Sequence, residues 1–160
     1  MYVSEVMVGP AVCCSAKTNL GQAAEIMWRE NCGLLPITNI QNKVIGVVTD
    51  RDLFIALATR NQLPGDVTVG EVTSGRLYSC KPSDDIHAAL ETMAKQGVRR
   101  LPVLDDAGKV TGILSADDVV TSAQMGDKPS LSCEDIVRTL RKIYVPHYAA
   151  VTHKKLARAA

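Results

Sequence analysis

The sequence of 160 residues predicts an α/β (α+β) fold of two pseudo-symmetric repeats, each a small sheet with two packed helices, and a C-terminal helix. Three observations lead to this prediction. The chain matches itself without a gap when it is shifted by 66 residues. In each copy, segments with helical spacing of apolar residues alternate with short apolar segments typical of strands. A further segment with helical spacing follows the second copy. We therefore expect three regions, at residues 1–60, 61–126 and 127–160.

The internal repeat is supported by identical residues along its length. The stretch LLPITNIQNKVIGVVTDRD (34–52) aligns with RLPVLDDAGKVTGILSADD (100–118). A unit of about 60 residues buries too little apolar surface to be more than marginally stable alone, so we expect the two copies to pack together. Identical residues occupy the matching positions Glu5/Glu71, Val6/Val72, Cys14/Cys80, Met27/Met93, Leu35/Leu101, Pro36/Pro102, Lys43/Lys109, Val44/Val110, Gly46/Gly112 and Asp52/Asp118.

The first helix of each copy is predicted from apolar residues at i, i+3, i+4 and i+7, which form one helical face. Thr18 or Asn19 is expected to cap the first of these helices. Ser83 is expected to cap the second, with Asp84 and Asp85 at its positive end. The apolar faces consist of Leu20, Ala23, Ala24 and Met27 in the first copy and of Ile86, Ala89, Leu90 and Met93 in the second.

Two strands and a second helix complete each copy. The strands are predicted at 34–38 and 44–48 in the first copy, and at 101–104 and 110–114 in the second. Residues favourable for turns separate them, Asn42 in the first copy and DDAG (105–108) in the second. The second helices are predicted to begin at Asp50 and at Ala116.

A helix is also predicted from Ser132 to Lys142. Ser132 with Asp135 three residues later is typical of a helix start, and basic residues at 138, 141 and 142 suit a helix end. Ile136, Leu140 and Ile143 form an apolar stripe, which must pack on the repeats or on a second chain. Beyond residue 146 the sequence is basic, and we expect a frayed tail there.

The composition excludes several classes of protein. The 46% of apolar residues suffices for a core, and no run is long enough to span a bilayer. The net charge of +1 argues against nucleic acid as the main partner. The first residues lack the features of a signal peptide, so we expect a soluble cytoplasmic protein without membrane association.

The five cysteines give no pattern for a metal or redox site. They contain no CxxC pair and have no regularly spaced histidine partner, which favours reduced and mostly buried thiols. The sequence also lacks a GxSxG elbow and the glycine-rich loops of nucleotide-binding enzymes. We therefore expect neither catalysis nor a catalytic cofactor nor a metal.

A polar pair follows the second strand of each copy. Thr49 precedes Asp52 in GVVTDRD, and Ser115 precedes Asp118 in GILSADD. A hydroxyl residue followed by an acid at this spacing is a capping box. The same groups could also hold a nucleotide, because a carboxylate accepts two ribose hydroxyls and a helix start binds phosphate. Residue pattern alone leaves both roles open.

Taken together, the doubled pattern of helix, strand with Leu-Pro, turn and G-h-h-[ST]-x-x-D resembles a pair of CBS domains, also called a Bateman module. The resemblance covers about residues 1–125 and is most specific at 35–37 with 46–52, and at 101–103 with 112–118. It implies two repeats that pack through their sheets around two clefts, and a flat homodimer of such pairs. In that family the clefts bind adenosine compounds, and the modules regulate an attached or associated protein.

The resemblance implies two sets of binding residues. Arg99 and Arg100 are expected to contact phosphates because arginine suits phosphate geometry, whereas the first copy has Gly33 and Leu34 in their place. We therefore expect the cleft of Thr49 to be the occupied one. Its set is Thr49, Asp52, Lys81, Ile86, Val98, Arg99 and Arg100, and the set of the other cleft is Ser115, Asp118, Ser15, Leu20, Cys32, Gly33 and Leu34.

The functional prediction is a stand-alone regulatory module that binds AMP, ADP or ATP between its repeats and modulates a protein partner. Two alternatives stay open at this point. The clefts could be empty in a structural or interaction module, or they could bind S-adenosylmethionine or NAD(H). An enzyme that uses the cysteines is a third hypothesis, which would need a reactive thiol beside a base.

Overall fold

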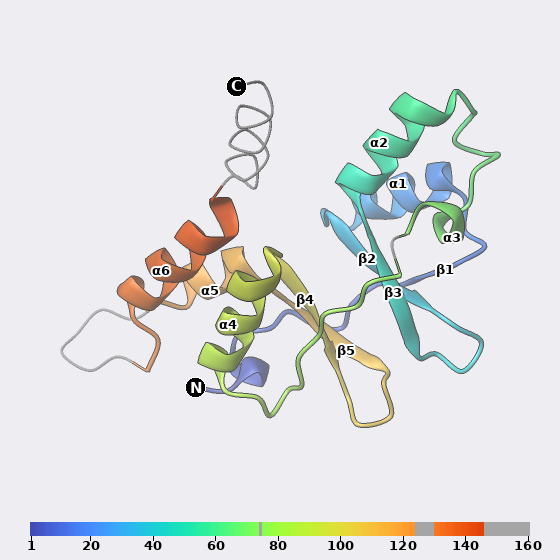
Figure 1. The fold of residues 1–160 in the computed structure, drawn as a ribbon. Coiled ribbons are helices and arrows are strands. Elements are labelled where there is room, and N and C mark those ends of the chain that lie inside the picture. Colours follow the sequence, from blue (N-terminus) through green and yellow to red (C-terminus); the bar gives the residue numbers. More distant parts are fainter. Residues whose placement is uncertain (74, 124–129, 146–160) are drawn as a thin grey trace, which may run out of the picture.

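The computed structural model describes residues 1–73, 75–123 and 130–145 and has the α/β architecture expected from the sequence. Helices α1, α2 and α3 lie at one end of the molecule and helices α4, α5 and α6 at the other, with the strands between them (Figure 1). The first repeat contains η1 (Val3–Glu5), β1 (Cys14–Ser15), α1 (Leu20–Arg29), β2 (Leu34–Thr38), β3 (Val44–Thr49) and α2 (Asp50–Arg60). The second contains α3 (Val69–Val72), α4 (Ile86–Gln96), β4 (Arg100–Leu104), β5 (Val110–Ser115) and α5 (Ala116–Thr121), and α6 (Cys133–Tyr144) follows.

The two sheets have the same register. β2 pairs antiparallel with β3 and β4 with β5, and β1 adds a short parallel strand to β2. Leu34 is opposite Thr49, and Arg100 is opposite Ser115. The first residue of one strand thus lies beside the N-cap of the helix that follows its partner strand, which is where the binding motif was predicted.

The helix starts follow the capping rules, with one correction. The Asn19 side chain caps α1 by accepting a hydrogen bond of 2.8 Å from the amide of Gln22. The prediction of Ser83 as the cap of α4 is wrong, because Asp85 occupies that position and accepts from the amide of His87 at 2.9 Å. Ser83 instead lies in the preceding turn, where the carboxylate of Asp84 accepts from the amide of Lys81.

The N-terminal segment of each repeat packs into the core of the other repeat. Val3, which is fully buried, belongs to the core of the second repeat, and Val69, also fully buried, belongs to the core of the first. The amide of Val3 donates to Asp84, and at the matching positions the amide of Val69 donates to Thr18. Each core is therefore complete only with a segment from the other repeat.

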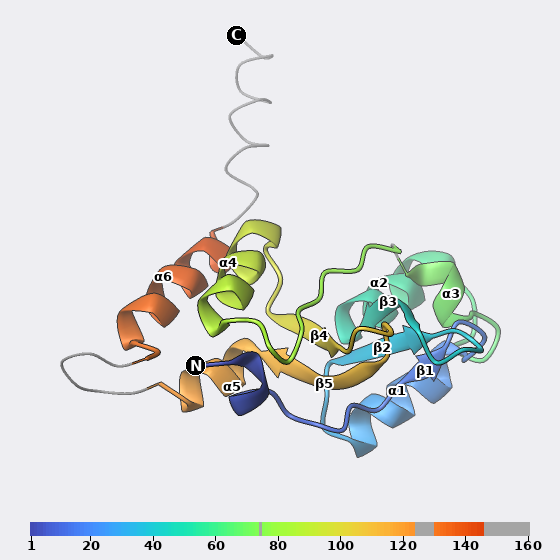
Figure 2. The same ribbon diagram turned by 90° about the horizontal axis from the view of Figure 1, so that it is seen from below.

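The N-terminal segment passes beside β5 (Figure 2) and forms an antiparallel backbone bridge with it. Val8 and Ile113 exchange two backbone hydrogen bonds, of 2.9 and 2.8 Å. A Cβ atom on Gly112 would lie only 2.7 Å from the carbonyl oxygen of Val8, so only glycine permits this crossing. The glycine of the second G-h-h-[ST]-x-x-D motif therefore has a packing role.

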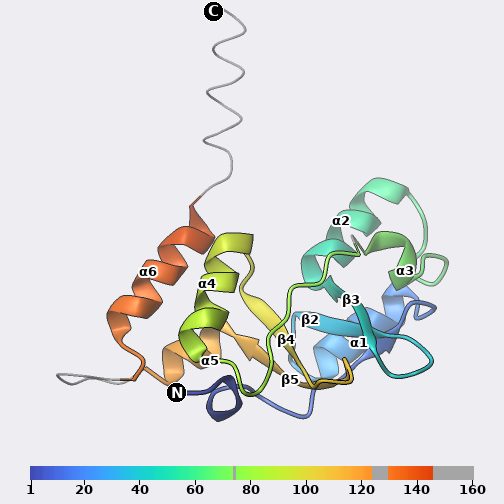
Figure 3. The same cartoon turned by 60° about the horizontal axis from the view of Figure 1, so that its bottom comes forward.

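Helix α6 covers the outer helical face of the second repeat (Figure 3). Ser132 caps it and Asp135 completes the capping box, as predicted. Ile136 is buried in the core of the second repeat, and Leu140 and Ile143 pack against that core. The predicted apolar stripe is therefore covered by the same chain. The predicted tail beyond residue 146 lies outside the described residues.

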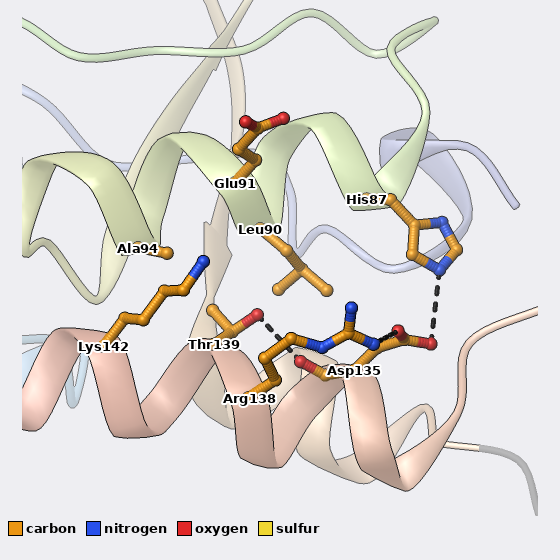
Figure 4. Close-up of a pocket in the computed structure, with 8 residues that line it drawn as sticks. All are labelled: His87, Leu90, Glu91, Ala94, Asp135, Arg138, Thr139 and Lys142. Carbon is orange, nitrogen blue, oxygen red and sulfur yellow. Dashed lines mark hydrogen bonds and ion pairs between the residues drawn. The ribbon is translucent and has the colours of Figure 1, made fainter.

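The outer helical face of the first repeat has no such cover among the described residues. Trp28 is 89% exposed and Phe54 is 71% exposed, although they are the single tryptophan and the single phenylalanine of the chain. The residue that matches Trp28 in the second repeat is Ala94, which lies where α4 faces α6 (Figure 4). The small side chain in one repeat leaves room for α6, and the large one in the other protrudes into solvent.

Candidate functional site

Thr49 and Asp52 form a complete capping box at the start of α2. The carboxylate oxygen Oδ2 of Asp52 accepts hydrogen bonds from the amide of Thr49 at 2.9 Å and from its hydroxyl at 2.7 Å. The Thr49 hydroxyl in turn accepts from the amide of Asp52 at 3.2 Å. The other carboxylate oxygen, Oδ1, has no hydrogen bond from the described residues, so the capping box uses one oxygen of the group and leaves the other open.

The second repeat has the same arrangement. The oxygen Oδ2 of Asp118 accepts from the amide of Ser115 at 2.9 Å and from its hydroxyl at 2.6 Å. The Ser115 hydroxyl accepts from the amide of Asp118 at 3.1 Å. Both helices therefore begin with a preformed hydroxyl and carboxylate pair.

A cavity of about 530 Å³, which we call the first cleft, opens beside Thr49 and Asp52. It lies between the start of α2 and the chain that runs from α4 into β4. Five of the seven residues predicted for this cleft line it, namely Thr49, Asp52, Val98, Arg99 and Arg100.

Lys81 and Ile86, the other two residues predicted for the first cleft, are not among its lining residues. The ammonium group of Lys81 pairs with Asp106 at 2.7 Å, which raises the pKa of Lys81 and draws its side chain to the turn between β4 and β5. Ile86 is fully buried in the core of the second repeat. Lys81 is therefore held away from the first cleft by an ion pair, and Ile86 is part of the core instead.

A cavity of about 550 Å³, which we call the second cleft, opens beside Ser115 and Asp118. Cys32 and Leu34 also line it, as predicted for this set. Ser15, Leu20 and Gly33 do not. Ser15 pairs with Thr18 in an exposed turn, and Leu20 is buried in the core of the first repeat. Gly33 lies in a neighbouring hollow against Asp50 and Arg100.

Several lining residues were missed by the sequence analysis. Tyr78, Arg76 and Arg51 line the first cleft, and Glu30 and Asp117 line the second. Alignment of the repeats gives a partial signal for Tyr78. This residue matches Val12 of the first repeat, and Tyr78 and Val12 line opposite clefts. Tyr78, Arg76 and Glu30 lie outside the helices and strands, where the residue pattern gives no reason to prefer a position, whereas Arg51 and Asp117 lie in the first turns of α2 and α5.

The two clefts differ in charge. The first is lined by four arginines and two aspartates, Arg51, Arg76, Arg99, Arg100, Asp50 and Asp52. The second is lined by three acids, Glu30, Asp117 and Asp118, and by one arginine, Arg100. Because arginine binds phosphate in a fork geometry, the first cleft has the chemistry for a phosphorylated ligand and the second does not.

The first cleft is linked to the C-terminal helix through Arg99. A hydrogen bond to the Tyr144 oxygen is the largest cause that raises the pKa of Arg99, and Asp117 and Asp50 contribute to it. Tyr144 is the last residue of α6. The end of this helix therefore lies close to Arg99.

The sequence model of the CBS domain matches this chain twice, at residues 3–59 and 69–124. The chain belongs to the CBS domain family. The two matches correspond to the two repeats, so the molecule is a CBS pair, and the observed fold agrees with the resemblance that the sequence indicated.

Relatives of this CBS pair include the CBS domain-containing protein YhcV of Bacillus subtilis, which is 30% identical over 135 residues, 84% of this chain and 94% of YhcV. The chain spans only about half the length of the protein MK0525 of Methanopyrus kandleri, to which it is 30% identical over 61% of its own length. It spans 23% of a homoserine O-acetyltransferase of Methanohalobium evestigatum, at 24% identity over 74% of this chain.

Solved structures of CBS pairs have the same fold. The CBS pair of MJ0100, in complex with 5′-methylthioadenosine and S-adenosyl-L-methionine, superposes with a TM-score of 0.70 at 23% identity, covering 76% of this chain and 94% of that one. The protein PAE2072 of Pyrobaculum aerophilum, complexed with AMP, gives a TM-score of 0.68 at 24% identity, covering 74% of this chain and 90% of that one. At these identities the likeness establishes the fold.

The cysteines of the CBS pair are less buried than expected: Cys14 and Cys80 are buried, Cys13 and Cys32 are partly buried, and Cys133 is exposed. Burial raises the pKa of Cys14 to about 11 and that of Cys80 to about 12, and it also raises the pKa of Cys13 and of Cys32. A raised pKa lowers the fraction of reactive thiolate. Within residues 1–73, 75–123 and 130–145, no group of three metal-ligating side chains is present, and no helix of that part is long and apolar enough to cross a bilayer.

Proposed function

We propose that this CBS pair senses an adenine nucleotide such as AMP, ADP or ATP, which binds in the first cleft. The observation that carries the proposal is the set of four arginines around the preformed Thr49–Asp52 pair. A ribose needs an acceptor and a phosphate needs cations, and the first cleft holds both beside a helix start.

Each group has a role in this proposal. The free oxygen Oδ1 of Asp52 accepts a ribose hydroxyl while Oδ2 keeps α2 capped. The phosphate lies against the start of α2 and is bound by Arg99 and Arg100. Tyr78, which lines the same cleft and packs against the core of the second repeat, offers an aromatic face for the adenine.

The relatives support the class of ligand. PAE2072 and CBSX2 were solved in complex with AMP, and the pair of MJ0100 with 5′-methylthioadenosine and S-adenosyl-L-methionine. All of these ligands contain adenosine. The charge of the first cleft favours the phosphorylated members of the class over S-adenosylmethionine.

The proposed output is regulation without chemistry. A ligand that prefers one arrangement of the two repeats stabilises it, and any protein partner with the same preference then binds more tightly. The raised pKa values of Cys13, Cys14, Cys32 and Cys80 argue against these four thiols as nucleophiles. The proposal places the protein in the cytoplasm, where adenine nucleotides are abundant and thiols stay reduced.

A homodimer through the first repeat completes the proposal. The exposed Trp28 and Phe54 line the same shallow hollow over α1 and α2, and aromatic side chains are enriched at protein interfaces. Helices α1 and α2 carry equal numbers of acidic and basic residues, so two copies of this face meet without net repulsion. Since α6 covers the corresponding face of the second repeat, the contact is expected at the first repeat alone.

Thermal unfolding with added ligands tests the proposed function. AMP, ADP, ATP, adenosine, NADH and S-adenosylmethionine are added separately to the full chain. A ligand at 100 times its Kd adds about 2.7 kcal/mol of stability, which raises Tm by several degrees. We expect larger shifts with AMP than with adenosine at equal concentration. An absence of any shift at millimolar concentration would refute nucleotide sensing and favour an interaction module with empty clefts.

A further inference from the structure

Arg100 lies where the two clefts meet. It lines both the first cleft and the second, and its side chain is 27% exposed. The matching residue of the first repeat, Leu34, also lines both clefts and is buried. The two-fold relation of the repeats therefore brings one apolar and one basic side chain to the same boundary.

The guanidinium of Arg100 has an acidic neighbour from each cleft. On one side, Nη2 lies 4.0 Å from Oδ2 of Asp117, which lines the second cleft. On the other side, a Cβ atom on Gly33 would lie 2.8 Å from Oδ2 of Asp50 and 3.4 Å from Nη1 of Arg100. The carboxylate of Asp50 and the guanidinium of Arg100 thus lie beside the same space over Gly33. Only glycine leaves this space open, because any other residue would place a side chain there.

The pair with Asp117 is easily exchanged. Asp117 is 88% exposed, and ion pairs between solvated groups are weak. A bound phosphate, which offers two oxygens to the planar guanidinium, is a stronger partner. In the second cleft Arg100 is the sole basic lining residue of the described chain, against Glu30, Asp117 and Asp118.

We propose that Arg100 couples the two clefts, so that an anionic nucleotide in the first increases the affinity of the second for a positively charged nucleoside. The proposal rests on nucleotide binding in the first cleft. A phosphate there engages Arg100 and draws it away from Asp117. Asp117 then lacks the guanidinium that faced it, and a cationic ligand in the second cleft takes its place. By linkage, the cationic ligand raises the affinity for the phosphate by the same factor.

Calorimetric titration of the full chain with two pairs of probes tests the coupling. AMP and adenosine differ by the phosphate, and S-adenosylmethionine, with its sulfonium charge, is compared with uncharged 5′-methylthioadenosine. We expect saturating S-adenosylmethionine to tighten AMP binding by about 3- to 10-fold, toward the lower end of couplings seen between sites. Adenosine binding should stay unchanged, and 5′-methylthioadenosine should leave AMP binding unchanged.

Three variants separate coupling from simple binding. Arg100→Leu introduces the leucine found at the matching position of the first repeat. It should reduce the coupling factor, the ratio of AMP affinities with and without saturating S-adenosylmethionine, to one. Asp117→Asn, at an exposed position where folding is not at risk, should tighten AMP binding alone and reduce the factor. Arg51→Leu is the control, because Arg51 is another arginine of the first cleft and does not line the second. It should weaken AMP binding but keep the factor.

The outcomes distinguish this inference from the proposed function. If AMP and adenosine both fail to bind the unmodified protein, the proposed function is refuted and the coupling with it. If AMP binds and the factor is one, or if S-adenosylmethionine does not bind or competes with AMP, only the coupling is refuted. An unchanged factor in both Arg100→Leu and Asp117→Asn would also refute it.

Discussion

The hydroxyl of Thr49 donates a hydrogen bond of 2.7 Å to Oδ2 of Asp52, and this bond holds the carboxylate in one orientation at the start of α2. The orientation leaves the other oxygen of the carboxylate free for a ligand. A capping interaction and a binding interaction are therefore compatible at one residue, and substitution of that residue should affect both.

Asp52→Ala and Asp118→Ala form a matched pair that separates the two effects. Each removes the acid of one capping box and should lower the free energy of unfolding by about 1 kcal/mol. Only Asp52→Ala should abolish the stabilisation by AMP, because only the first cleft carries the arginine set. Denaturant unfolding and AMP titration measure the two quantities. Equal loss of AMP binding in both variants would contradict the assignment to the first cleft.

Tyr78→Val introduces the valine found at the matching position of the first repeat. Loss of the aromatic face should weaken AMP binding by about 10-fold or more, because stacking of one base on an aromatic side chain contributes roughly 1–3 kcal/mol. Tyr78→Phe keeps the ring and serves as the control. If both variants bind AMP like the unmodified protein, the adenine lies elsewhere.

Low pH should weaken the capping of α6 and so lower the free energy of unfolding. A hydrogen bond from Ser132 is the largest cause that lowers the pKa of Asp135 below its usual 3.8, and His87, 3.4 Å away, adds to the shift. Because the folded pKa is lowered, the stabilisation is complete above the unfolded value and is lost as pH falls through the folded one. Denaturant unfolding between pH 6 and pH 3 measures it. Asp135→Asn should be less stable at pH 6 and should lose less stability on acidification.

Val3→Ala and Val69→Ala test the exchange of N-terminal segments. Both valines are fully buried, and each loss should cost about 2 kcal/mol. Native-state hydrogen exchange reports where protection falls. Val3→Ala should reduce protection first in α4, β4 and β5, and Val69→Ala in α1, β2 and β3. The opposite assignment would show that each segment packs within its own repeat.

Trp28→Ala tests the proposed dimer face. The substitution gives the first repeat the residue found at Ala94 in the second, and it should shift a dimer toward monomer in sedimentation experiments without loss of stability. Ile40→Ala is the control, since Ile40 is 93% exposed but lies in the turn between β2 and β3. A monomer already formed by the unmodified protein at high concentration would refute the dimer.

Much of the architecture could be predicted because the repeat presents each element twice. The strands that begin near Leu34 and Arg100 and the helices that begin at Asp50 and Ala116 follow from aligned patterns and capping boxes. The cap of α4 was misplaced because Ser83, Asp84 and Asp85 are all good capping residues in a row. Capping propensity does not distinguish these three residues. The turn that precedes α4 decides which of them becomes the N-cap.

The binding site was predicted less completely for a different reason. Alignment of the repeats identifies matching positions. It does not show whether Val3 and Val69 pack into the core of their own repeat or into the core of the other one. Lys81 was expected in the first cleft, and its ion pair with Asp106 arises from a turn that has no equivalent charge in the first repeat. Tyr78 lies in an irregular segment, for which the residue pattern gives no prediction of which cleft its side chain lines.

The crossing of Val8 over Ile113 also has a consequence for synthesis of the protein. The partners are separated by about a hundred residues, so the N-terminal segment leaves the ribosome long before β5 exists. Val3 has no core to enter until α4 has been made, and the first repeat lacks Val69 until its own second helix is complete. Neither half can reach its final packing while the other is unmade, so the pair is expected to mature as one unit only after both repeats have been synthesised.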